Sequence, residues 1–99
     1  LVIVVMNNNV LGMVRQWQTM FYNEHYSFTT LDRKTDFVKL AEAFGAKGLR
    51  ADNEVQFEKC VKEAFNTNGT VVIDCQINCD ERVLPMIPPG GAVDDLILK

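Results

Sequence analysis

The chain has 99 residues, 47% of them hydrophobic and 23% charged, and its net charge at pH 7 is −3. This length allows one domain with a thin core, and the composition excludes a disordered or low-complexity chain. Because acidic residues outnumber basic ones and no basic cluster occurs, nucleic-acid binding would lack its main electrostatic contribution. The opening apolar run, residues 1–6, is far shorter than the ~20 residues of a membrane span, and we expect no membrane segment.

The first third of the chain predicts a strand, a helix and a loop. Residues 1–6 form a continuous apolar run, which is typical of a strand buried on both faces. From Val10 to Tyr22 apolar residues recur at helical spacing, and the polar, irregular residues 23–35 predict a loop. A natural amino terminus seldom lies in mid-strand, so we expect this chain to be a piece of a longer protein.

The middle of the chain predicts a second helix over residues 36–44, ended by a glycine, and a short strand over 46–51. Asn53 with Gln56 three residues later resembles a capping box, which predicts a third helix. A second apolar strand is expected over residues 70–77.

Residues 80–99 contain all three prolines and predict an extended tail that is ordered by docking. The alternation of strands and helices predicts an α/β fold with a parallel sheet and right-handed crossovers. Three strands cannot cover both faces of such a sheet, so we expect most of the sheet to lie outside this sequence.

The three cysteines, Cys60, Cys75 and Cys79, contain no Cys-x-x-Cys pair. Their odd number argues against a disulfide framework and favours a reducing compartment. One histidine and three scattered cysteines also lack the ligand spacing of a zinc site. We interpret the cysteines as buried structural thiols.

Three asparagines, Asn7–Asn9, follow the first predicted strand directly. In open α/β sheets ligands bind at the carboxyl ends of the strands. A carboxamide oxygen and a turn carbonyl are neutral oxygen ligands suited to Mg²⁺, and the next helix would point its amides at a bound phosphate. An ordinary asparagine-rich turn remains the alternative.

The sequence around this turn resembles the end of the thiamine-diphosphate motif, which opens with Gly-Asp-Gly and closes with Asn-Asn. Its continuation, Leu11-Gly-Met-Val-Arg-Gln-Trp-Gln18, resembles the catalytic subunit of acetolactate synthase (acetohydroxyacid synthase). The resemblance extends over the whole chain, through Phe21-Tyr22, Tyr26-Ser27, Leu40–Gly45 and Val83–Pro88. It implies that residues 1–99 are the carboxyl-terminal part of a doubly wound, parallel-sheet thiamine-diphosphate-binding domain with an extended tail over residues 80–99.

The resemblance also assigns a cofactor site. Asn8 would bind Mg²⁺ through its side chain and Val10 through its backbone carbonyl. The register could be shifted by one residue, to the pair Asn8-Asn9, but the distance to the Leu-Gly-Met sequence favours Asn7-Asn8. The residues assigned to the cofactor are Asn8, Val10, Leu11, Gly12 and Met13.

By the same resemblance Met13, Val14 and Trp17 line the substrate channel, where Trp17 would favour the longer of two acceptor 2-keto acids. A core position for this tryptophan is the alternative. Arg15 could meet a carboxylate or lie on a solvated helix face. His25 stands where the family usually has Arg, so a general-base role has little support.

The activity implied is a thiamine-diphosphate-dependent transferase of branched-chain amino-acid biosynthesis. It condenses two pyruvates, or pyruvate and 2-ketobutyrate, with release of CO₂. The family further implies Mg²⁺, FAD bound outside this chain, a homodimer or tetramer, a regulatory small subunit, and a cytoplasmic or plastid location.

Gly-Asp-Gly is absent from the sequence, and the activating glutamate belongs to another domain in this family. We therefore expect no catalytic residue in these 99 residues and no activity from them alone. The alternatives are another thiamine-diphosphate enzyme, of the glyoxylate carboligase or pyruvate oxidase type, and a non-catalytic α/β interaction module.

Overall fold

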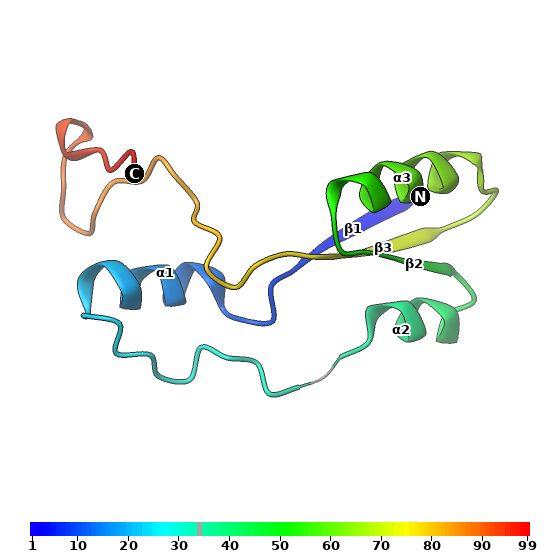
Figure 1. Ribbon diagram of the computed structural model, residues 1–99, viewed down its shortest axis with the longest axis horizontal. Helices are drawn as coiled ribbons and strands as arrows, with labels where there is room; N and C mark the ends of the chain where they lie inside the picture. Colours follow the sequence, from blue (N-terminus) through cyan, green and yellow to red (C-terminus); the bar gives the residue numbers. More distant parts are fainter. Residues whose placement is uncertain (34) are drawn as a thin grey trace.

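The computed structural model describes residues 1–33 and 35–99, in which three strands and three α-helices form an α/β arrangement (Figure 1). Lys34, in the predicted loop, lies outside the described residues. In chain order the elements are β1 (Val2–Asn7), α1 (Gly12–Phe21), α2 (Phe37–Ala43), β2 (Lys47–Ala51), α3 (Glu54–Asn66), β3 (Val71–Gln76) and a 3₁₀ helix (Val93–Asp95).

The three strands form one parallel sheet in the order β1-β3-β2, so the last strand in the sequence is central. Ile73 of β3 pairs with Val4 on one side and with Leu49 on the other. Val71 and Ile73 are fully buried, which places the hydrophobic core along β3. The predicted α/β class with a parallel sheet is confirmed.

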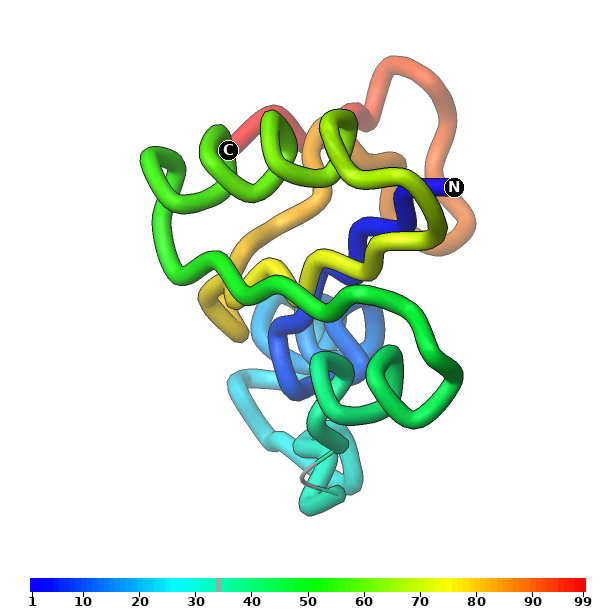
Figure 2. The backbone as a smooth tube through the Cα atoms, turned by 90° about the vertical axis from the view of Figure 1, so that its right-hand side faces the viewer, coloured from blue at the N-terminus to red at the C-terminus, as the bar shows by residue number. Residues whose placement is uncertain are grey.

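α3 covers one face of this sheet and α2 the other (Figures 1 and 2). Cys60 and Ala64 on α3 belong to the same buried cluster as Val71 and Ile73. On the opposite face α2 packs against β2, where a Cβ on Gly48 would lie 2.7 Å from the Val38 carbonyl oxygen. The absence of a side chain at this position lets helix and strand approach.

Side-chain caps set where two of the helices begin. The Asp36 carboxylate accepts hydrogen bonds from the amides of Val38 and Lys39, and the Asn53 side chain accepts one from the Gln56 amide. The predicted capping box is half correct, because the Gln56 side chain accepts from the Asp52 amide rather than from Asn53.

α1 stands apart from the sheet, beyond the carboxyl ends of the strands, together with the tail (Figure 1). The molecule is accordingly elongated, with extents of 47 × 29 × 21 Å. None of the helices described is long and apolar enough to cross a membrane.

The structure corrects two details of the predicted elements. Ile3, Val4 and Met6 of β1 are exposed, whereas the sequence predicted burial on both faces; β1 is an edge strand here, and α2 and α3 pack against β2 and β3. The first helix begins at Gly12 rather than at Val10, because Val10 forms an antiparallel bridge with Thr30 in the loop.

Candidate functional site

The turn after β1 is built by asparagine side chains that bond to the backbone two residues ahead. The Asn7 Oδ1 atom accepts from the Asn9 amide at 3.3 Å, and the Asn8 Oδ1 atom accepts from the Val10 amide at 3.2 Å. Asn9 takes a left-handed φ of 57°, which asparagine adopts more readily than most residues. These bonds turn the chain from the end of β1 into the start of α1.

Gly12 keeps the Asn8 carboxamide against the first turn of α1. A Cβ at Gly12 would lie 2.7 Å from the Asn8 Nδ2 atom, so any larger residue would displace that side chain. Among residues 1–33 and 35–99, no side chain caps the amino end of α1. This end therefore combines free amide groups with the positive end of the helix dipole, an arrangement suited to an anion.

Two oxygen atoms at this turn are suited to a hard cation. A carboxamide oxygen has two lone pairs, and the Asn8 Oδ1 atom uses one for the Val10 amide. The Val10 carbonyl oxygen accepts no hydrogen bond from the part of the chain that the structure describes. In that same part no cluster of three or more His, Cys, Asp or Glu side chains could hold a metal. The turn thus supplies two neutral ligands, and Mg²⁺ requires more to complete an octahedron.

A groove runs along α1 and into the loop that follows this helix. Val14 and Trp17 line it together with Gln18, Phe21, Tyr22, Asn23 and His25, and its volume is about 520 Å³. Trp17 is 39% exposed, so it is not a core residue among the described elements. Met13, the third residue assigned to the substrate channel, is 50% exposed and does not line the groove.

The sequence analysis missed a buried glutamine that attaches the tail to α1. Gln16 is only 4% exposed, and its side chain binds both polar backbone atoms of Val83: Oε1 accepts from the amide at 2.8 Å, and Nε2 donates to the carbonyl at 3.1 Å. The sequence did contain a signal for the burial of Gln16, because this residue shares a helix face with the apolar side chains of Met13 and Met20. This side chain is one of the contacts that dock the tail on α1.

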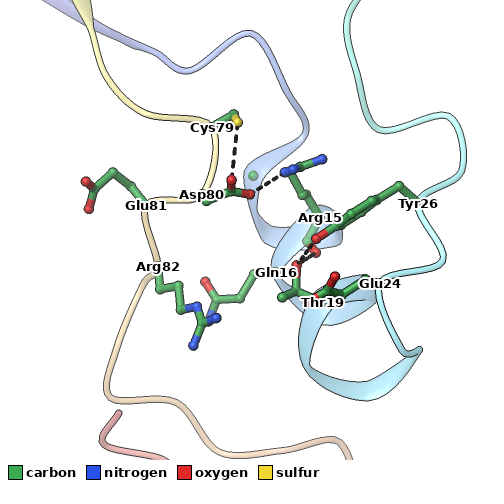
Figure 3. A pocket seen from close by; sticks show the side chains of 10 residues that line it. Arg15, Gln16, Thr19, Glu24, Tyr26, Cys79, Asp80, Glu81 and Arg82 are labelled. Carbon is green, nitrogen blue, oxygen red and sulfur yellow. Dashed lines mark hydrogen bonds and ion pairs between the residues drawn. The ribbon is translucent and has the colours of Figure 1, made fainter.

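Arg15 is not solvated, although that interpretation was left open. Its side chain is 16% exposed and donates from Nε to Asp80 at 2.7 Å, at the start of the tail (Figure 3). The guanidinium also lies 4.0 Å from the centroid of the Tyr26 ring, and the Tyr26 hydroxyl contacts Thr19. The hydrogen bond from Arg15 lowers the pKa of Asp80 below its usual value.

This ion pair lies in a polar pocket of about 320 Å³ between α1, the following loop and the tail (Figure 3). The residues that line it come from all three segments: Gly12, Arg15, Gln16, Thr19, Glu24, Tyr26, Cys79, Asp80, Glu81 and Arg82.

All three cysteines are free thiols. Cys60 is buried in the core, and its burial raises the pKa of the thiol. Cys75 and Cys79 are only half-buried, so the interpretation as buried structural thiols holds for Cys60 alone.

Residues 1–75 match the family model described as "Thiamine pyrophosphate enzyme, C-terminal TPP binding domain". The chain is 44% identical over 96 residues to the acetolactate synthase large subunit of Porphyra purpurea, covering 96% of this chain and 16% of that protein. It is 40% identical to the mitochondrial acetolactate synthase catalytic subunit of Saccharomyces cerevisiae, over 96% of this chain and 14% of that protein. It is 39% identical to the large subunit of acetolactate synthase isozyme 2 of Escherichia coli, over 98% of this chain and 18% of that protein. The chain thus spans less than a fifth of the length of these relatives.

Replacing Gln16 by methionine should release the tail from α1. The methionine side chain has a similar shape but loses both hydrogen bonds to Val83. Together these bonds have a net value of roughly 1–2 kcal/mol, so the Val83 amide should exchange its hydrogen about 5–30-fold faster. Gln18→Met is the matched control, because Gln18 donates to Ser27 in the loop and not to the tail. Equal Val83 exchange in both variants would show that Gln16 does not hold the tail.

The pKa of the Asp80 carboxyl, followed by NMR titration, should lie below 3.8 and rise toward that value in Arg15→Gln. Because the folded-state pKa is lowered, the ion pair stabilises tail docking above pH ~4, and this contribution disappears as the pH falls through the lowered pKa. Arg82→Gln should raise the Asp80 pKa less, because Arg82 acts only through its charge. A larger rise from Arg82→Gln than from Arg15→Gln would contradict the assignment.

Proposed function

From the membership of this chain in the thiamine pyrophosphate enzyme family, in which it matches the C-terminal TPP-binding domain, we propose that the chain binds the cofactor diphosphate through Mg²⁺. We propose further that residues 1–99 are the carboxyl-terminal part of that domain, with residues 80–99 as its tail. One observation carries the proposal: directly after β1, the Asn8 carboxamide lies against the amino end of α1, which no described side chain caps.

In this proposal Asn8 and Val10 would hold Mg²⁺, which when bound would offset the charge of the phosphates. Leu11, Gly12 and Met13 would contact the cofactor, and Gly12 keeps the space that the Asn8 side chain needs. Thiamine diphosphate, when bound, supplies the carbanion chemistry that breaks the bond next to a 2-keto carbonyl. The residues of this chain bind and orient; none of them acts as a catalytic acid or base.

The complete protein is proposed to be an acetolactate synthase, which condenses two pyruvates, or pyruvate and 2-ketobutyrate, with loss of CO₂. The relatives named above support this, and their names favour it over a glyoxylate carboligase or a pyruvate oxidase. The groove beside Trp17 and Val14 offers an apolar surface for the alkyl group of the acceptor, and Met13 would lie at the cofactor end of the channel.

The relatives named as large subunits also support a regulatory small subunit as a partner. We propose in addition a homodimer or tetramer, FAD bound outside these residues, and a location in the cytoplasm or in a plastid. The three free thiols fit a reducing compartment.

Removing the proposed metal ligand tests the cofactor site. In the complete subunit Asn8→Ala should weaken Mg²⁺-dependent binding of thiamine diphosphate, measured by calorimetry, by ~10–100-fold or more, because even residues that only orient ligands are worth that much. Asn7→Ala and Asn9→Ala are the controls and should weaken binding less. If Asn9→Ala proves the most damaging, the metal-binding register is shifted by one residue.

Replacing Trp17 by leucine should lower the preference for 2-ketobutyrate over pyruvate as acceptor while acetolactate still forms. The lost apolar contact serves mainly the longer acceptor, and one methylene is worth ~1–3 kcal/mol in such a pocket. The measurement is a competition with both acceptors present and both products counted. Trp17→Phe keeps a ring and should keep more of the preference. An unchanged product ratio with a large fall in Tm would make Trp17 a core residue of the complete protein.

A further inference from the structure

A buried carboxylate lies directly behind the asparagine turn. Asp74 is on the central strand β3 and is 1% exposed. Its Oδ1 atom accepts hydrogen bonds from Asn7 at 3.0 Å and from Gln76 at 2.9 Å. Its Oδ2 atom accepts from the Arg50 Nε atom at 3.3 Å. Three elements of the sheet therefore converge on one charged group.

This carboxylate decides which way the Asn7 side chain points. An ionised carboxylate only accepts hydrogen bonds, so the NH₂ group of Asn7 must face Asp74. The Asn7 oxygen is then turned outward, where it accepts the amide of Asn9 at 3.3 Å. With the opposite orientation of the carboxamide, two oxygens would face each other at Asp74 and two N–H groups would face each other at Asn9.

Arg50 extends the same network to the start of α2. Its Nη2 atom donates to Asp36 at 3.0 Å, and Asp36 caps α2 by accepting two backbone amides. Asp74 is thus fixed by Arg50 on the β2 side and can hold Asn7 on the β1 side. The turn is connected to the rigid centre of the sheet through side chains as well as through its own backbone.

We propose that Asp74 is a positioning residue for the cofactor site: its carboxylate orients Asn7, and Asn7 holds the turn in which Asn8 is presented to the metal. The proposal rests on the proposed role of Asn8 and Val10 as Mg²⁺ ligands. Asp74 itself contacts neither metal nor cofactor.

The test is a calorimetric titration of Mg²⁺ into the complete subunit at saturating thiamine diphosphate. Asp74→Asn should weaken Mg²⁺ binding about 10-fold, less than Asn8→Ala does, because the carboxamide at position 74 no longer forces one orientation on Asn7. The double variant Asn7→Asp, Asp74→Asn exchanges donor and acceptor and should recover most of the lost affinity. Gln76→Leu is the control: it removes another donor from Asp74 without touching the turn and should leave the affinity unchanged.

A merely structural role for Asp74 would lower stability in urea in all these variants and leave the Mg²⁺ affinity of the folded protein unchanged. Unchanged affinity in Asp74→Asn, or no recovery in the exchanged pair, would overturn the inference. If Asp74→Asn does not fold, Asn7→Leu breaks the same link from the other side, and unchanged affinity there would equally overturn it. Failure of the unaltered protein to bind Mg²⁺ with the cofactor would instead remove the proposed function, and the inference with it.

Discussion

β1 and β3 pair in parallel from Val2 and Val71 to Asn7 and Gln76, and this ladder determines where the other functional elements lie. Parallel strands bring their carboxyl ends to the same edge of a sheet, so the asparagine turn after β1 emerges next to the end of β3. The chain that leaves β3 leads into the tail, while the chain that leaves β1 leads into α1. Because both leave from one edge, tail and α1 meet beyond the sheet (Figure 1).

The attachment of α1 differs from that of the other two helices. α2 and α3 are held by packing against the sheet, whereas α1 is held by polar contacts with the loop and the tail. Gln16 and Arg15 supply two of these contacts, to Val83 and Asp80. This arrangement leaves the apolar side of α1, with Val14 and Trp17, open as a groove. A helix packed on the sheet by that side would have no such surface to offer to a ligand.

Local patterns in the sequence were sufficient for most of the elements and for the class of fold. The cap at Asn53 and the apolar run of β3 act over a few residues, and the structure retains both. The pairings of Arg15 with Asp80, Gln16 with Val83 and Asp74 with Arg50 could not be predicted in the same way, because the two residues of each pair lie 24 or more positions apart in the chain. The exposure of β1 depends on which strand occupies the edge, and a pattern of apolar residues does not contain that information.

Both hydrogen bonds between Gln16 and residue 83 are made to main-chain atoms of that residue. These bonds do not depend on the side chain at position 83, so valine could be exchanged for almost any residue without loss of either bond. Proline is the exception, because it has no amide hydrogen to donate. The tail can therefore diverge in sequence at this point, and in the chemistry it presents to its surroundings, while its anchor on α1 stays where it is.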